Sequence, residues 1–259
     1  MTLLLWILLF CLLGGVLSVA AVGTFLLFSE SLRTRLLPHL VSFATGALLG
    51  AAFLALLPHA LEGPGIDDFH ELMMAVLLGL LAFFILEKMV LWRHCHTDHC
   101  EAHAPHSGHG EGKAASLILI GDGLHNFVDG VLIAAAFMTD FHLGVVTSVA
   151  IAAHEIPQEV GDFAILLHSG FSRRKAFFFN LLSSFTTILG GLLAWFSLQN
   201  LEFALPYVLA VAASSFIYIA VADLIPGLHQ RVDKKDTVYQ VVLIVLGVVV
   251  IHFAHATVH

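Results

Sequence analysis

The sequence predicts an all-α integral membrane protein whose eight transmembrane helices pack into one bundle. The first observation is composition: 59% of the 259 residues are hydrophobic, 12% are charged, and the mean hydropathy is +0.93. Soluble domains carry about 25% charged residues, so this chain has too little polar surface to cover a globule in water. The second observation is a series of eight apolar segments of about the length that crosses a bilayer. The third is the placement of the basic residues.

The eight segments are expected at 3–28, 39–61, 70–92, 114–138, 142–168, 175–198, 203–225 and 237–258. Turn or charge signals such as Pro38, Pro64 and Asp140 separate them. The first segment lacks the positive start of a signal peptide and is too long for its apolar core, so we expect a retained span. We predict one transmembrane transporter domain over 1–259, with a His-rich cytoplasmic loop at about 93–113.

The basic residues all fall in or beside the first, third, fifth and seventh connections. They are Arg33, Arg35, Lys88, Arg93, Lys113, Arg173, Arg174, Lys175, Arg231, Lys234 and Lys235. With eight spans these connections share one side of the membrane. The positive-inside rule makes that side cytoplasmic, and both termini are then extracytoplasmic.

Two spans of opposite expected orientation end in similar strings. Leu57-Pro58-His59 ends the second span, and Ile225-Pro226-Gly227-Leu228-His229 ends the seventh. Such a pair suggests inverted repeats around the central spans 4 and 5, a common transporter design. Chance similarity of two short strings is the alternative.

Polar residues interrupt the centres of the fourth and fifth segments. The fourth carries Asp122, His125, Asn126 and Asp129, and the fifth carries His154, Glu155, Gln158, Glu159 and Asp162. At helical spacing Asp122, His125 and Asp129 share a face, and His154 lies one turn before Gln158. A charge inside a membrane costs roughly 2.5–3.5 kcal/mol, and its usual partner is another charged side chain. No Lys or Arg occurs between Lys113 and Arg173, so the counter-charge must be protons, a metal ion, or both.

The residue types favour a metal. Imidazole and carboxylate together suit borderline divalent ions such as zinc, iron or manganese. We predict the ligands to be His125, Asn126, Asp129, His154, Glu155 and Gln158. Asp122, Glu159 and Asp162 either support these ligands or make polar contacts near helix ends. A lone intramembrane His or Asn would more simply be a hydrogen-bonding contact between helices.

The two strings resemble motifs of the ZIP (Zrt-/Irt-like protein) family of metal-ion transporters. Residues 125–130 (HNFVDG) are similar to the HNxxDG pattern of its fourth span, and residues 154–157 (HEIP) to the HEIP of its fifth. Glu159, Gly161 and Asp162 are similar to the HEIPHELGD form of one subfamily. The resemblance covers most of the chain, including the eight-span layout and the His-rich third connection.

The resemblance implies a transport site that the fourth and fifth spans share and that can hold two ions. It implies that His125 and Asp129 help to bind one ion, Asn126 and Glu155 the other, with His154 and Gln158 near both. Gln158 departs from the family, which usually has His or Glu there, and a neutral amide is a weaker ligand. Some relatives add a carboxylate from the sixth span, where this chain offers Asn180 and Ser183.

The third connection is crowded with metal-binding side chains. They include His94, Cys95, His96, His99, Cys100 and His103. We interpret this tract as a flexible cytoplasmic segment that collects delivered metal; a solvated linker with incidental affinity is the alternative. The second connection is acidic and faces outside, where it would concentrate cations unless it is an ordinary acidic loop.

These observations predict uptake of divalent transition-metal ions, zinc foremost, into the cytoplasm. The metal is expected as the transported substrate, with no organic cofactor. The partners are metal ions and the lipid bilayer of a plasma membrane, with a bacterial inner membrane favoured; the absence of a basic face excludes nucleic acid, and a homodimer is left open. One alternative is an intramembrane zinc-dependent hydrolase, because His154-Glu155 begins an HExxH string, although position 158 is Gln. Another is an exporter of the cation-diffusion-facilitator type.

Overall fold

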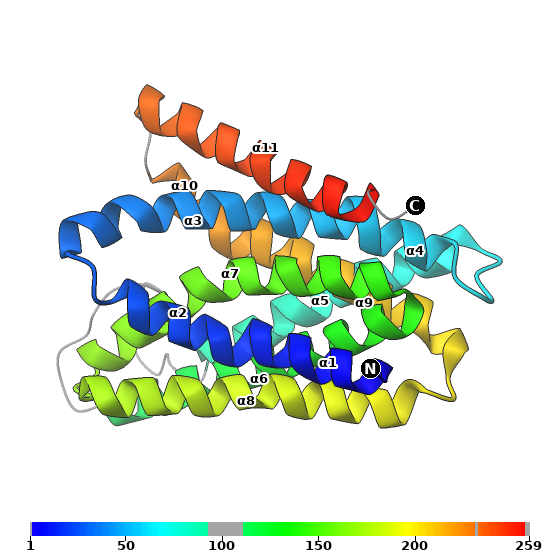
Figure 1. Ribbon diagram of the computed structural model, residues 1–259, viewed down its shortest axis with the longest axis horizontal. Helices are drawn as coiled ribbons and strands as arrows, with labels where there is room; N and C mark the ends of the chain where they lie inside the picture. Colours follow the sequence, from blue (N-terminus) through cyan, green and yellow to red (C-terminus); the bar gives the residue numbers. More distant parts are fainter. Residues whose placement is uncertain (1, 93–110, 231–232, 257–259) are drawn as a thin grey trace.

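Helices make up all regular structure in the described residues, 2–92, 111–230 and 233–256, of this computed structural model (Figure 1). The first rod consists of α1 (Leu3–Cys11), the π-helical η1 (Leu12–Val16) and α2 (Leu17–Phe25). The second consists of α3 (Glu30–Ala51), the π-helical η2 (Ala52–Leu56) and α4 (Leu57–Leu61). Four long helices follow: α5 (Phe69–Trp92), α6 (Glu111–Thr139), α7 (Phe141–His168) and α8 (Arg173–Leu198). The remaining elements are the 3-10 helix η3 (Glu202–Ala204), α9 (Leu205–Tyr218), the π-helical η4 (Ile219–Leu224), α10 (Ile225–His229) and α11 (Lys234–Ala256).

Seven helical stretches of the described chain are long and apolar enough to cross a membrane. They are Leu3–Phe25, Glu30–Leu61, Phe69–Met89, Leu119–Thr139, Arg173–Leu198, Glu202–His229 and Lys234–His255. α7 has 28 residues and is also long enough, but His154, Glu155 and Gln158 lower its apolarity. The protein is therefore an all-helical integral membrane protein, and the eighth span stays a prediction.

The helix ends differ from the predicted ones at two prolines. Pro38 is predicted to separate two segments, yet α3 begins at Glu30 and continues through it. The fixed φ of proline is compatible with a helix, so the effect is one missing hydrogen bond rather than a break. The seventh span likewise continues past the predicted end at 225 to His229. α6 already begins at Glu111, so the last three residues of the predicted 93–113 loop are helical.

The second and seventh spans share a local structure. In each, a π-helical segment precedes a five-residue helix that has proline at its start: Pro58 after η2, and Pro226 after η4. Because proline has no N–H, the carbonyls of Leu54 and Ala222 lose their α-helical hydrogen-bond partners. The wider π-helical turn also relieves the clash between each proline ring and the same carbonyl. This common feature favours the predicted inverted repeat.

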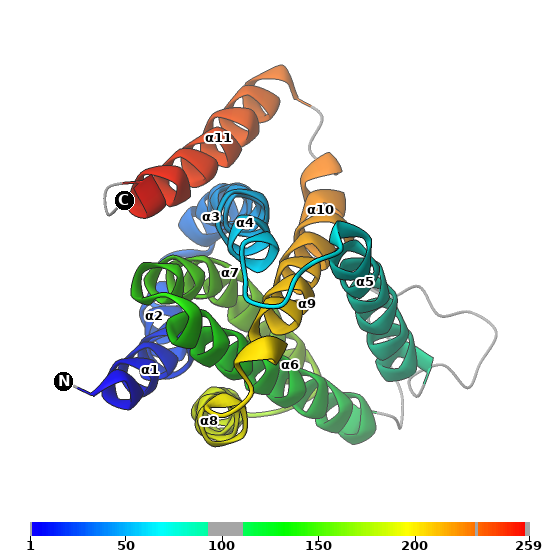
Figure 2. The same cartoon turned by 90° about the vertical axis from the view of Figure 1, so that its right-hand side faces the viewer.

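α7 lies in the interior of the bundle, where it contacts α2, α3, α6, α8 and α11. Figure 2 shows α5 and α11 at the periphery. In the apolar stretches of α5 and α11 only 11% of the residues are buried, against 50% in Leu119–Thr139 of α6. These two helices therefore present most of their surface to the surrounding solvent. In a membrane protein that solvent is lipid, and the polar residues of α6 and α7 lie inside.

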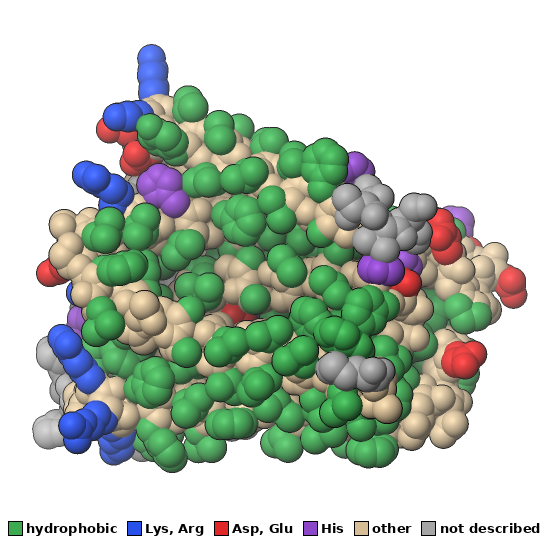
Figure 3. All heavy atoms as spheres, viewed as in Figure 1, with side chains coloured by type: hydrophobic (Ala, Val, Ile, Leu, Met, Phe, Trp, Pro, Cys, Tyr) green, Lys and Arg blue, Asp and Glu red, His purple; other side chains and the backbone are tan. Residues whose placement is uncertain are grey.

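Charged side chains are distributed unequally along the bundle. On the face shown in Figure 3, Lys and Arg gather at the end where α3, α8 and α11 begin. We call this the basic end. The opposite end, formed by α4, η3 and the α6–α7 connection, carries acidic side chains such as Glu62 and Glu202. The Lys and Arg side chains drawn on this face thus gather at one end, as the eight-span prediction expects.

Candidate metal centre

Four metal-ligating side chains of α6 and α7 converge inside the bundle. His125 and Asp129 are one turn apart on α6, and His154 and Glu155 are consecutive on α7. One ligand atom from each residue lies within 4.8 Å of the others. Among the described residues, this is the one group of three or more His, Cys, Asp or Glu side chains with such geometry. We call these four residues the centre.

The distances within the centre match the spacing of ligands around one small cation. His125 Nε2 lies 3.2 Å from His154 Nε2, 3.4 Å from Glu155 Oε1 and 3.8 Å from Asp129 Oδ2. His154 Nε2 lies 3.4 Å from Asp129 Oδ2 and 3.8 Å from Glu155 Oε1. A tetrahedral zinc ion with arms of about 2.1 Å has ligands about 3.4 Å apart. Five of the six ligand pairs are therefore near the edge length of such a tetrahedron.

A hydrogen bond orients the imidazole of His154. Its Nδ1 lies 3.1 Å from the carbonyl oxygen of Ala150, which can only accept, so Nδ1 carries the proton. Nε2 then bears the lone pair and faces the centre, the arrangement usual for metal-binding histidines. The ring of Phe216 from α9 packs against that of His154 at a centroid distance of 6.1 Å.

Among the described residues, no Lys or Arg pairs with the carboxylates of the centre, whose ion-pair partners are His125 and His154. Asp129 and Glu155 are each 1% exposed, and none of their carboxylate oxygens has a hydrogen-bond donor. His125 and His154 cannot both be protonated, because two N–H groups would face each other at 3.2 Å. With at most one imidazolium facing two buried carboxylates, at least one negative charge is left over, whereas one divalent ion between neutral imidazoles would balance both carboxylates.

Asn126 and Asp122 point toward α8 rather than into the centre. The amide of Asn126 donates to Asp122 Oδ1 over 2.8 Å, and its oxygen accepts the hydroxyl of Thr187 over 2.9 Å. The other carboxylate oxygen of Asp122 accepts from Ser183. Both residues of α6 are thus engaged with α8, although the oxygen of Asn126 keeps a second lone pair.

The other site residues predicted on α7, Gln158, Glu159 and Asp162, follow the centre toward the basic end. Glu159 is fully buried; one carboxylate oxygen accepts from Ser184 over 3.0 Å, and the other has no donor. Gln158 and Asp162 are half-buried. Asn180 of α8 donates to the backbone carbonyl of Glu159 over 3.4 Å. Acidic and amide groups thus continue for two turns beyond the centre.

Close packing of α6 against α8 sets these contacts. A Cβ added at Gly130 would lie 1.9 Å from the carbonyl oxygen of Thr187, and one at Gly190 would lie 2.0 Å from that of Phe127. Glycine therefore allows the two backbones to touch, as small residues often do between membrane helices. Ser184 and Thr187 are supporting residues that were not predicted from the sequence. Their helical spacing from Asn180 and Ser183 is the signal that could have found them.

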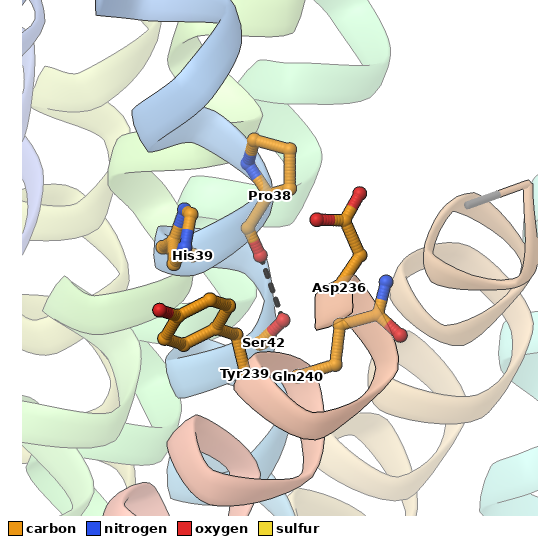
Figure 4. Close-up of a pocket in the computed structure, with 6 residues that line it drawn as sticks. All are labelled: Pro38, His39, Ser42, Asp236, Tyr239 and Gln240. Carbon is orange, nitrogen blue, oxygen red and sulfur yellow. Dashed lines mark hydrogen bonds between the residues drawn. The ribbon is translucent and has the colours of Figure 1, made fainter. Parts of the chain in front are cut away.

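The predicted loop ligands His94, Cys95, His96, His99, Cys100 and His103 fall outside the described residues. A small pocket between α3 and α11 near the basic end is lined by Pro38, His39, Ser42, Asp236, Tyr239 and Gln240 (Figure 4). None of these residues belongs to the centre.

Comparisons with known proteins give the context of these residues. A family model described as "ZIP Zinc transporter" matches residues 91–254, which include the centre. The zinc transporter ZIP13 of Pongo abelii is 36% identical over 230 residues, covering 83% of this chain and 65% of that protein. The mouse (Mus musculus) protein of the same name is 33% identical over 288 residues, covering 93% of this chain and 78% of that protein. The metal cation symporter ZIP14 of Mus musculus is 43% identical over 129 residues, covering 49% of this chain and 26% of that protein.

Proposed function

The chain belongs to the ZIP zinc transporter family, and from that premise we propose that it carries divalent transition-metal ions, zinc foremost, into the cytoplasm through the centre. As a member of this family it is a transporter and not an enzyme. The metal ion is its substrate. We propose His125, Asp129, His154 and Glu155 as the ligands of that ion, with Asn126 and Gln158 as accessory groups on its path.

One observation carries the proposal: the buried carboxylates of Asp129 and Glu155 face only the two histidines of the centre, and no Lys or Arg occurs between Lys113 and Arg173 to pair with them. Removing a charge from water without a partner is costly, and breaking a buried ion pair costs about 3–5 kcal/mol. A divalent cation that binds these carboxylates stabilises the centre electrostatically. The relatives, named as zinc or metal cation transporters, support the same cargo.

The ligand set suits passage better than permanent binding. Transport needs a site that binds an ion strongly enough to admit it and weakly enough to release it. The centre offers two imidazoles and two carboxylates and no thiolate, unlike the Cys-rich sites that hold structural zinc. His125, with a side chain 19% exposed, is its most accessible member.

We propose release toward the basic end. Glu159 and Asp162 follow Glu155 on α7 in that direction and give a departing cation a series of oxygen ligands. The positive-inside rule supports assigning the basic end to the cytoplasm. On this assignment the His-rich loop, 93–113, would receive the ion.

Zinc uptake by liposomes that contain the purified protein tests this function. We expect saturable uptake by the unaltered protein and loss of at least 90% of the rate in His125→Ala and His154→Ala. His168→Ala, an exposed histidine on the same helix as His154, is the matched control and should transport normally. Undiminished uptake by both centre variants would reject the proposed site. Release of a peptide or lipid product without zinc uptake would favour the hydrolase alternative.

The finer predictions about location and assembly remain proposals. The relatives compared above come from animals, so the predicted bacterial inner membrane rests on the sequence alone. The homodimer left open by the sequence also stays a prediction, which cross-linking in native membranes would test.

A further inference from the structure

A cavity of about 200 Å³ opens at the end of the bundle opposite the basic end. It lies between α4 with the turn that follows it, the last turn of α6, η3 and the start of α9, elements that can be found in Figure 1. A cavity needs roughly 10–15 Å³ for each enclosed water, so this space has room for a divalent cation with its full set of about six waters. On the proposed orientation, the cavity faces the side from which the ion arrives.

The side chains that line the cavity include groups that bind borderline divalent ions. His59 of α4 provides an imidazole and Glu202 of η3 provides a carboxylate; Met138 adds a thioether at the wall. Nδ1 of His59 lies 3.0 Å from the carbonyl oxygen of Ala55 and must donate to it, so Nε2 is the nitrogen that carries the lone pair. His154 in the centre is oriented in the same way.

The electrostatics of this end favour a cation. α6 ends at Thr139 against the cavity, and the last carbonyls of a helix carry partial negative charge. The next residue, Asp140, caps α7 by accepting the N–H groups of His142 and Leu143 over 2.8 and 2.9 Å. Burial tends to raise the pKa of Asp140, but these two N–H groups, together with the nearby imidazoles of His142 and His59, outweigh burial and hold the pKa below its usual range. Asp140 therefore remains negative at neutral pH beside a cavity that no Lys or Arg lines.

Apolar packing separates the cavity from the centre. Met138 lies nine residues beyond Asp129 on α6, which is about 14 Å along the helix axis. Between them, Leu132, Ile133 and Phe137 are at most 2% exposed, and Leu209 of α9 is fully buried at the cavity wall. An ion in the cavity therefore keeps water around it, whereas an ion in the centre is enclosed by protein.

We propose that this cavity is an entrance site, where His59 and Glu202 bind the hydrated divalent ion before it moves to the centre. The proposal rests on the transport function above and adds a second binding step. Because an entrance site sets how readily ions are captured from dilute solution, its loss should raise KM. Turnover depends on the later passage through the centre, so it should change little.

The experiment measures zinc uptake by proteoliposomes over a range of zinc concentrations. We expect Glu202→Gln and His59→Ala each to raise KM at least fivefold, with the maximal rate within twofold of the unaltered protein. Glu62→Gln is the matched control, because Glu62 is an exposed carboxylate of the same end that does not line the cavity. Its KM should stay within twofold. His59→Gln, which keeps a polar side chain of similar reach, replaces His59→Ala if the alanine variant does not fold.

The outcomes separate this proposal from the transport function. If KM is unchanged in the Glu202 and His59 variants while the unaltered protein transports zinc, the entrance site is rejected and the function stands. The entrance site is also rejected if Glu62→Gln raises KM as much as Glu202→Gln does, since general attraction by charge would then suffice. If the unaltered protein takes up no zinc, the function itself fails.

Discussion

Replacing His154 by alanine is expected to weaken zinc binding at the centre by at least about 100-fold. His154 Nε2 lies within 3.2–3.8 Å of the nearest side-chain atoms of His125, Asp129 and Glu155, so its imidazole is one corner of the proposed ligand tetrahedron. Groups that merely orient a metal ligand contribute about 10–100-fold to affinity, and removing the ligand itself should reach at least the upper end. A 100-fold change corresponds to about 2.7 kcal/mol.

The His154→Ala substitution removes one ligand and leaves the charge of the centre unchanged. Asp129 and Glu155 remain, so the electrostatic attraction for a divalent ion is kept while one coordination bond is lost. Zinc affinity would be measured in detergent by competition with a chromophoric chelator, and the fold by circular dichroism. His168→Ala on the same helix should leave the affinity unchanged. A folded His154→Ala protein that binds zinc within threefold of the unaltered affinity would refute the assignment of His154 as a ligand.

Three further predictions concern stability, measured by unfolding in detergent. Gly190→Ala should destabilise the protein by about 1–3 kcal/mol, because the new Cβ would overlap the Phe127 carbonyl. Gly161→Ala is the control: nothing lies within 4 Å of the new Cβ, so the substitution should stabilise the protein by about 0.5–1 kcal/mol. A destabilised Gly161→Ala protein would contradict this packing argument. Thr187→Val should lower the stability by about 1–3 kcal/mol, because the buried Asn126 oxygen loses the hydroxyl that donates to it over 2.9 Å. Thr187→Ser keeps a hydroxyl and should retain most of that stability. Equal stabilities of the Val and Ser variants would show that this hydrogen bond is unimportant. Asp140→Ala should cost about 0.5–2 kcal/mol at pH 7 through the lost cap. Since the pKa of Asp140 is lowered on folding, its contribution is present above about pH 4 and is lost as pH falls through the folded value, so the two proteins should converge in acid. A difference that is constant with pH would contradict the charged cap.

The helices and most of the centre could be predicted from local sequence alone. Eight apolar segments of the right length became eight helical rods, because a backbone in lipid has few alternatives to a helix. His125 and Asp129 are spaced i, i+4 and therefore share a face of α6 whatever surrounds them. The absence of Lys and Arg between Lys113 and Arg173 is the basis for the proposal that Asp129 and Glu155 bind a cation.

The direction in which Asn126 points could not be predicted in the same way. It is adjacent to His125 in sequence, but its amide bonds with Asp122 and Thr187 on the α8 side. The orientation of the Asn126 side chain depends on how closely α8 approaches α6. Gly130 and Gly190 determine that distance through contacts between residues far apart in the chain. Helix ends at Pro38 and Pro226 were misplaced because proline removes one hydrogen bond but its fixed φ is compatible with a helix, so neither proline ends its span.

Anomalous X-ray diffraction at the zinc absorption edge, on crystals of the zinc-loaded protein, would test the central claim most directly. We predict a peak among His125 Nε2, His154 Nε2 and one oxygen each of Asp129 and Glu155, at about 2.0–2.2 Å from each. Zinc bound elsewhere, with these four side chains free of metal at saturating zinc, would contradict the claim that this centre carries the ion.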